Sequence, residues 1–265
     1  MTDAARLDGE PAGRVVGLDG CAGGWFAVWN GVDEPLAHER YDTLEAVFAD
    51  HAAADRMLVD IPIGLTNDGP RDCDTEAREQ LGLRGVSVFP APSRGVVDYR
   101  REHTDDASYE RATELQREQL DSGISQQAWN ITDKIAEMDA YLQEHTPAVD
   151  VYESHPECCF AALNDGYPIA HSKSGQTGRA ARFAVLADEL ADWEDCYRSA
   201  CDDYYYNQVA RDDIIDAMVL VAAGRCPLAS IPDQPPVDDE IERQTQIVVP
   251  AREPVWDEYL DVATL

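Results

Sequence analysis

The chain has 265 residues, of which 52 are aspartate or glutamate and only 21 are lysine or arginine, so its formal net charge is −31 at pH 7. This composition excludes a broad basic surface of the kind that usually binds nucleic acid, because such binding depends largely on neutralising phosphates. The length suits one large domain with its own hydrophobic core.

The acidic residues are spread over the whole chain, and Lys134 and Lys173 are its only lysines. We interpret this pattern as adaptation to molar salt, in which charges are screened within roughly 3 Å at 1 M. A halophilic source is therefore expected, and an acidic surface that attracts a specific partner is the alternative.

The cysteines and the N-terminus indicate a cytoplasmic protein. The seven cysteines include no CxxC pair, which suits free thiols in a reducing cytosol. Residues 1–13 are polar and acidic, unlike a signal peptide, and predict a disordered lead-in. The longest apolar run, residues 217–224, is too short to cross a membrane, so no membrane partner is expected. The oligomeric state stays open.

The first part of the chain predicts three strands, a helix and a fourth strand. The strands are expected over residues 14–20, 25–30, 35–41 and 56–62, and the helix over residues 42–52. The glycine-rich stretch at 20–24 joins the first two strands, and Pro62 ends the fourth. This order predicts an antiparallel meander whose first strand also pairs with the fourth in parallel.

The rest of the chain predicts mostly helices around one more strand. The expected helices cover 71–82, 106–123, 125–145, 156–163, 177–193 and 209–224, and the fifth strand covers 148–154. A polar, proline-rich tail is expected to follow the last helix. We therefore predict a single α/β domain over residues 14–250, with a helical insertion at 66–145 and tails at 1–13 and 251–265.

Carboxylates stand at the strand ends of this predicted sheet. Asp19 lies on the first strand, Asp60 at the end of the fourth and Glu153 at the end of the fifth. Ligand sites in open α/β sheets favour the carboxyl ends of strands, so these acids are expected to converge. Asp213 and Asp216 lie three residues apart, on one face of the last helix.

Crowded carboxylates raise each other's pKa or recruit a cation. Mg²⁺ and Mn²⁺ prefer oxygen ligands, and pairs of such ions roughly 3.5–4 Å apart catalyse phosphoryl displacement. We therefore predict a site for two divalent ions, with Asp19, Asp60, Asp213 and Asp216 as the metal ligands.

Several stretches of the chain match a known family over residues 15–250. They are GLDGCAGGW, DIPIGL, RDCDTEAREQLG, VSVFPAPSR, SQQAWNITDKI, YESHPE, HSKSGQTGRAAR and DDIIDAMV. The order of acids and elements is similar to the RNase H-like fold, particularly its Holliday-junction resolvase branch. More closely, the chain resembles an uncharacterised bacterial and archaeal family of predicted RNase H-fold nucleases, the domain-of-unknown-function family numbered 429.

This resemblance implies an RNase H-like α/β fold whose five-stranded mixed sheet, with three antiparallel and two parallel strands, is flanked by helices. It implies that the catalytic acids are Asp19, Asp60, Glu153, Asp213 and Asp216. The acidic background is a departure from the pattern, because an anion-repelling surface is unusual for RNase H-like nucleases.

Two stretches without acids, residues 80–97 and 166–187, offer candidate phosphate ligands. We predict that Lys173, Arg179, Arg182 and Arg94 bind substrate phosphates, since lysine supplies a point charge and arginine a fork of donors. A structural role for these stretches is the open alternative. Arg71 is instead expected to pair with nearby acids, and His155 either supports the acidic site or caps the following helix.

The favoured function is hydrolysis of a nucleic-acid or nucleotide phosphodiester by a two-metal mechanism with Mg²⁺ or Mn²⁺. The stretch GLDGCAGGW also resembles the first phosphate loop of actin-like and sugar-kinase ATPases, so a nucleotide-binding phosphotransferase is an alternative. A third possibility is a non-catalytic binding module on the same fold. The sequence leaves the substrate open between DNA, RNA, a junction and a small nucleotide.

Overall fold

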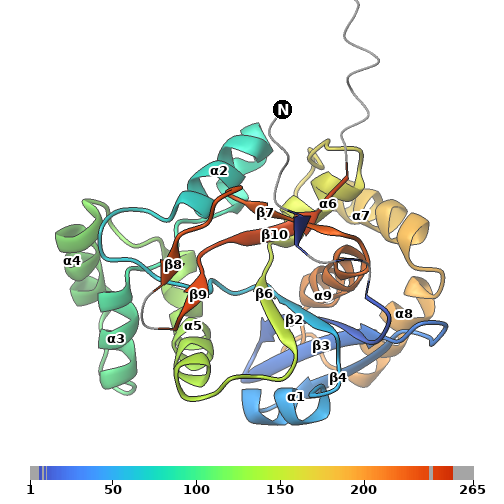
Figure 1. The fold of residues 1–265 in the computed structure, drawn as a ribbon, viewed down its shortest axis with the longest axis horizontal. Coiled ribbons are helices and arrows are strands. Elements are labelled where there is room, and N and C mark those ends of the chain that lie inside the picture. The colour runs from blue at the N-terminus through green and yellow to red at the C-terminus, as the bar shows by residue number, and fades with distance from the viewer. Residues whose placement is uncertain (1–5, 8, 10, 239–240, 253–265) are drawn as a thin grey trace, which may run out of the picture.

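The computed structural model of the protein describes residues 6–7, 9, 11–238 and 241–252. Its centre is a five-stranded sheet in the order β4-β3-β2-β5-β6 (Figure 1). The strands are β2 (Val15–Cys21), β3 (Gly24–Asn30), β4 (Ala37–Tyr41), β5 (Arg56–Val59) and β6 (Asp150–Glu153). The pairs β2–β3 and β3–β4 are antiparallel, whereas β2–β5 and β5–β6 are parallel. The predicted mixed sheet is therefore confirmed.

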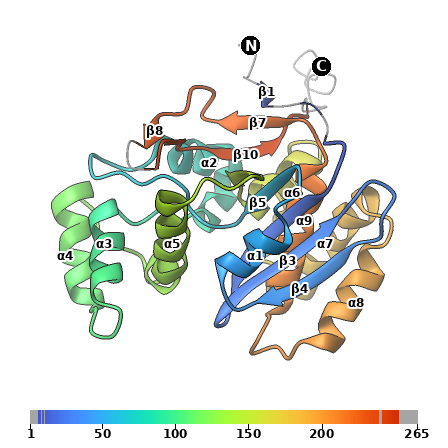
Figure 2. The ribbon, with the colours of Figure 1, turned by 60° about the horizontal axis from the view of Figure 1, so that its bottom comes forward.

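Helices cover both faces of this sheet because its strands are apolar on both sides. On one face, α9 (Arg211–Gly224) packs against Phe26, Val28 and Leu58. On the other face, Val16 and Leu18 pack with residues of α1 (Leu44–Asp50) and α5 (Gln126–Glu144). Figure 2 shows α1 in front of the sheet and α9 behind it.

Strand β2 and helix α9 make a close backbone contact in this core. A Cβ atom on Gly17 would lie 2.1 Å from the carbonyl oxygen of Ala217 and 2.9 Å from the Cβ of Leu220. Only glycine leaves enough room for the helix to lie directly on the strand. This contact sets the distance between Asp19 on the strand and the acids of α9.

We expect Gly17→Ala to lower the free energy of unfolding by about 1–3 kcal/mol, because overpacking forces the helix backbone to shift. Chemical denaturation measures the loss. Gly9→Ala is the control, since a Cβ there meets nothing within 4 Å. Equal stabilities of the two variants would contradict the close packing of α9 on β2.

The segment between β5 and β6 is helical, as predicted. It contains α2 (Asp72–Leu81), the 3₁₀-helix η1 (Gly82–Ser87), α3 (Arg94–Glu102), α4 (Tyr109–Leu120) and α5. In both views α3 and α4 stand on the far side of α5 from the sheet (Figures 1 and 2). Helix α3 was not predicted, because prolines and valines dominate the stretch where it begins. Ser93 caps this helix by accepting a hydrogen bond from the Val96 amide.

The segment after β6 contains α6 (Pro156–Leu163), α7 (Gln176–Glu189), α8 (Trp193–Asp203) and α9. The helix predicted over 177–193 ends at Glu189, and α8 begins separately at Trp193. No helix in the described part of the chain is long and apolar enough to cross a membrane.

The prediction of a polar, proline-rich tail directly after the last helix is wrong, because short strands follow α9. These are β7 (Leu228–Ile231), β8 (Val237–Asp238), β9 (Arg243–Gln244) and β10 (Ile247–Pro250). A three-stranded sheet has the order β1-β7-β10, where β1 (Arg6–Leu7) belongs to the predicted disordered lead-in. Strands this short have too few residues to show the alternation of apolar and polar side chains that predicts a strand. The remainder of both predicted tails, residues 1–5, 8, 10 and 253–265, lies outside the described residues.

Candidate active site

Asp19 and Asp60 meet at one end of the sheet because β2 and β5 run parallel. Leu18 pairs with Val59 in this register, so the next residue of each chain segment is an aspartate. The amide of Asp60 donates a hydrogen bond of 3.0 Å to the carbonyl oxygen of Leu18, which extends the pairing to this level. The two carboxylates therefore lie side by side.

The helix α9 brings a third carboxylate to the same place. One carboxylate oxygen from each of Asp19, Asp60 and Asp216 lies within 4.8 Å of the other two. We call these three residues the acidic cluster. Asp213, one turn earlier, lines the same cleft and accepts a hydrogen bond of 2.9 Å from the Ala210 amide at the start of the helix. The sequence prediction for these four acids thus agrees with their placement.

Burial and mutual repulsion disfavour the ionised forms of these acids. Burial, followed by the charges of Asp60, Asp213 and Asp216, raises the pKa of Asp19 well above its ordinary value. Burial is also the main cause that raises the pKa of Asp60 to about 7 and the pKa values of Asp213 and Asp216 to about 6. A cation among these carboxylates would favour their charged forms.

Lys173 supplies one positive charge to the acidic cluster. Its Nζ donates a hydrogen bond of 2.6 Å to Oδ2 of Asp216 and lies 3.7 Å from Oδ2 of Asp212. Burial opposes the charge on this lysine, but Asp216, Asp60 and Asp19 raise its pKa above the ordinary value. The other oxygen of Asp216, Oδ1, is buried and has no hydrogen-bond partner among the described residues. An unpartnered buried oxygen in a residue of a carboxylate cluster fits a cation ligand.

The acidic cluster lies at the floor of a cleft of about 850 Å³. The cleft is lined by residues of η1, of α5 and of the segment that precedes α9. Besides the acids, the lining includes polar and aromatic side chains, namely Arg84, Phe89, Gln127, Asn130, Lys134, Lys173, Tyr206, Asn207 and Gln208. Both lysines of the chain therefore line this one cleft.

Glu153 does not join the acidic cluster, which corrects its prediction as a catalytic acid. In the parallel pairing of β5 and β6, Glu153 stands opposite Val59 and not opposite Asp60. Successive side chains of a strand point to opposite faces, so this difference of one residue directs Glu153 away from Asp60. Its carboxylate accepts hydrogen bonds from the Ile63 amide and from Arg71, at 2.6 and 2.7 Å on the same oxygen.

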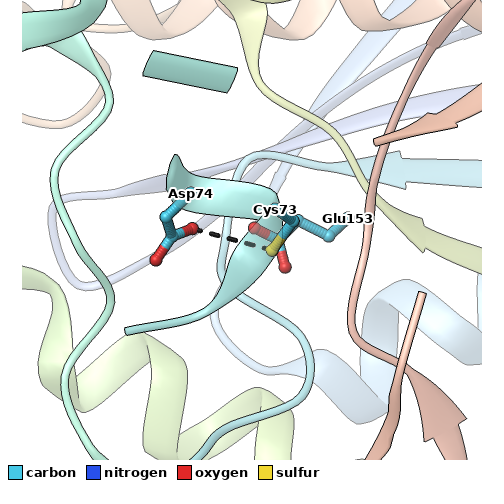
Figure 3. A group of neighbouring side chains, drawn as sticks. All are labelled: Cys73, Asp74 and Glu153. Carbon is cyan, nitrogen blue, oxygen red and sulfur yellow. Dashed lines mark hydrogen bonds between the residues drawn. The ribbon is translucent and has the colours of Figure 1, made fainter. Parts of the chain in front are cut away.

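Cys73, Asp74 and Glu153 form a second group whose side chains lie close together (Figure 3). The guanidinium of Arg71 already bonds to both carboxylates, at 2.5 Å from Asp74 and 2.6 Å from Glu153. Burial raises the pKa of the Cys73 thiol, which favours its protonated form. We assign this group to a buried ion-pair network, in agreement with the local pairing predicted for Arg71.

Of the predicted phosphate ligands, only Lys173 reaches the cleft. Arg94 is buried and pairs with Asp139 and Asp238 at 3.0 and 2.5 Å. Arg182 is fully buried against Glu157. Arg179 donates to the carbonyl oxygen of Ser174 and is not part of the cleft lining. The structural alternative therefore holds for Arg94 and Arg182.

Arg84 and Lys134 are cleft residues that the sequence prediction did not include. Arg84 lies 3.8 Å from Glu157, and its Nε is buried with no hydrogen-bond partner among the described residues. Lys134 pairs with Glu137 at 2.9 Å and lies over the ring of Trp25. Two features of the sequence could have identified these residues, namely the rarity of lysine and the absence of acids around Arg84.

His155 caps α6, as one of its two predicted roles required. Its Nδ1 accepts a hydrogen bond from the Glu157 amide, and its Nε2 lies 3.3 Å from the carbonyl oxygen of Ser87. Burial lowers the pKa of His155, which favours the neutral ring that this pair of contacts requires. The contact with Ser87 also fixes η1 against the acidic floor of the cleft.

A protein-family model described as "Protein of unknown function (DUF429)" matches residues 17–236, a range that includes all of the cleft's acids. No curated protein and no solved structure matches the chain.

Proposed function

The chain belongs to the DUF429 family of proteins of unknown function, and from the geometry of its cleft we propose that it is a metal-dependent phosphodiesterase. The proposed reaction is hydrolysis of a nucleic-acid or nucleotide phosphodiester. The observation that supports it most strongly is the convergence of Asp19, Asp60 and Asp216, with an unpartnered buried oxygen, in a cleft that also holds both lysines.

The donor set suits Mg²⁺ or Mn²⁺, which bind carboxylate oxygens. Asp19, Asp60 and Asp216 would hold such an ion, and Asp213, which lines the same cleft, would contribute to a second one. When bound, two such ions would activate a water molecule and stabilise the charge of the leaving oxygen.

The basic groups of the cleft would position the phosphate. Lys173 is held beside the acids by Asp216, so its ammonium group would lie next to a phosphate oxygen at the acidic cluster. Arg84 also lines the cleft, and its guanidinium would donate to a second oxygen. These contacts attract an anionic substrate into a cleft whose floor is acidic.

The phosphotransferase alternative is less well supported. The glycine-rich stretch forms a tight hairpin turn in which Cys21 pairs with Gly24. Arg40 donates to the carbonyl oxygens of Ala22 and Gly23, which fixes this turn against β4. So short a turn offers few free amides to surround a phosphate chain.

The proposal is tested with bis(p-nitrophenyl) phosphate, incubated with the full chain and Mn²⁺ at low and at molar KCl. We expect hydrolysis that depends on Mn²⁺ and stops when EDTA is added. No hydrolysis above that of free Mn²⁺ at either salt concentration would contradict the proposed function.

We expect Arg84→Gln to raise the KM for this substrate by about 10–100-fold with little change in kcat, because hydrogen bonds to charged groups contribute about 1.5–3 kcal/mol. Steady-state kinetics measure both constants. Arg179→Gln is the matched control, since that arginine lies outside the cleft lining. An equal KM for the two variants would remove Arg84 from the phosphate site.

The raised pKa of Asp60 predicts a dependence of stability on pH in the metal-free protein. Because its pKa is about 7 in the folded state against 3.8 ordinarily, the folded state binds the proton more tightly, and stability is lost as pH rises from about 4 to 7. Asp60→Asn should therefore raise the free energy of unfolding by on the order of 2 kcal/mol at about pH 8.

Thermal unfolding in EDTA measures this difference, which should shrink as the pH falls towards about 4. Asp68→Asn, at an exposed position, is the control and should match the wild type throughout. An Asp60→Asn variant less stable than the wild type at alkaline pH would contradict the crowding of the acids.

A further inference from the structure

We propose that the cleft takes a phosphodiester with unpaired bases, either a nucleotide-sized molecule or a single strand, and excludes duplex nucleic acid. The inference rests on the proposed function. Aromatic and amide side chains that line the cleft suit unpaired bases, and arginines elsewhere on the surface are paired with acids.

The charge of the protein surface opposes the docking of a duplex. Double-stranded DNA carries one negative charge per roughly 1.7 Å of its axis, and proteins bind it by neutralising several phosphates. The chain has a net charge of −31. Several surface arginines are already paired with acids, namely Arg100, Arg101, Arg111 and Arg198. The cleft is lined by Arg84, Lys134 and Lys173, which only a short run of phosphates can reach at once.

Aromatic side chains in the cleft offer faces on which bases can stack. Tyr206, in the segment between α8 and α9, is 67% exposed and lines the cleft. Phe89 is half-buried and lines the cleft just after η1. Base–aromatic stacking contributes about 1–3 kcal/mol per base and requires a base that is out of its duplex.

Amide side chains stand beside these rings. Gln127 and Asn130 lie on the first turns of α5, and Asn207 and Gln208 follow Tyr206. An amide both donates and accepts hydrogen bonds, which matches the edge of a base. Those edges are free only when the base is unpaired. Oδ1 of Asn130 accepts from Gln126 and Oε1 of Gln208 from the Tyr205 amide, which orients both side chains.

The size of the cleft agrees with this substrate. Its volume of about 850 Å³ falls in the range of roughly 300–1,000 Å³ that is typical of small-molecule sites. A dinucleotide fits this class of site, and the end of a single strand presents the same chemistry. A duplex would have to approach this cleft over the surface of a protein whose net charge is −31.

The test compares four substrates with the Mn²⁺-loaded full chain: bis(p-nitrophenyl) phosphate, a dinucleotide, a single-stranded oligonucleotide and the same oligonucleotide in a duplex. We expect kcat/KM for the single strand or the dinucleotide to exceed that for the duplex at least 100-fold. The substrate with the higher kcat/KM of these two shows whether the cleft takes a nucleotide-sized molecule or a single strand. Tyr206→Ala should lower kcat/KM for it about 10-fold, by loss of stacking.

Tyr205→Ala is the matched control, because Tyr205 is 80% exposed but does not line the cleft. If bis(p-nitrophenyl) phosphate is hydrolysed but the duplex is cleaved as fast as the single strand, or Tyr206→Ala equals Tyr205→Ala, the inference fails and the proposed function stands. If bis(p-nitrophenyl) phosphate is not hydrolysed, the proposed function itself fails.

Discussion

Replacing Asp216 with asparagine is expected to lower the rate of Mn²⁺-dependent phosphodiester hydrolysis at least about 100-fold. Even the mutation of a residue that only supports a metal ligand typically lowers metal affinity or activity about 10–100-fold. Asp216 is only 1% exposed, has one unpartnered oxygen and accepts a hydrogen bond from Lys173 on the other. Asparagine keeps the size of the side chain and can still accept the hydrogen bond from Lys173. The fold should therefore survive while the charge that attracts the cation is lost.

Asp212→Asn provides the matched control for this experiment. Asp212 lies one turn before Asp216 on α9 and also lies near Lys173, but its side chain is 40% exposed and outside the cleft lining. We expect this variant to keep at least half of the wild-type activity. Equal losses in the two variants would indicate a general effect of charge near Lys173 and would contradict a specific role for Asp216.

Arg71→Met is expected to lower the free energy of unfolding by about 3–5 kcal/mol, because removing one partner leaves buried charges uncompensated. The guanidinium of Arg71 is nearly inaccessible and bonds to both Asp74 and Glu153, and it also donates to the carbonyl oxygens of Ile63 and Gly64. Without it, two carboxylates remain in the interior. Denaturation by urea measures the loss.

Two further variants distinguish this network from a catalytic site. Arg198→Met breaks the exposed pair with Glu194 and should cost less than about 1 kcal/mol. Glu153→Gln should lower stability but leave the affinity for Mn²⁺ unchanged. If Glu153→Gln abolished Mn²⁺ binding, or if Arg71→Met were as stable as Arg198→Met, the assignment of this group to a structural role would be wrong.

The sequence predicted the elements that place the acidic cluster because their signals are local. Apolar runs mark β2 and β5, and the register of two parallel strands then brings Asp19 next to Asp60. The spacing of Asp213 and Asp216 follows from the helical repeat of α9. The helical segment between β5 and β6 was predictable for the same reason.

The errors have a common physical cause, namely contacts between residues that are far apart in the chain. The prediction placed Glu153 beside Asp60, whereas Glu153 pairs with Val59. This difference of one residue in the register puts the Glu153 side chain on the other face of the sheet. Arg94 finds its partners Asp139 and Asp238 across long separations, so its burial has no local signal. The short strands after α9 are stabilised by pairing with one another. The halophilic source and the domain boundaries stay predictions.

The acidic cluster as a cation site is the central claim, and anomalous diffraction from crystals soaked in Mn²⁺ tests it most directly. The measurement compares the wild type with Asp19→Asn. We predict an anomalous peak among Asp19, Asp60 and Asp216 in the wild type, and its loss in the variant. An ordered cluster without a peak, or a peak at Cys73, Asp74 and Glu153 instead, would contradict the account.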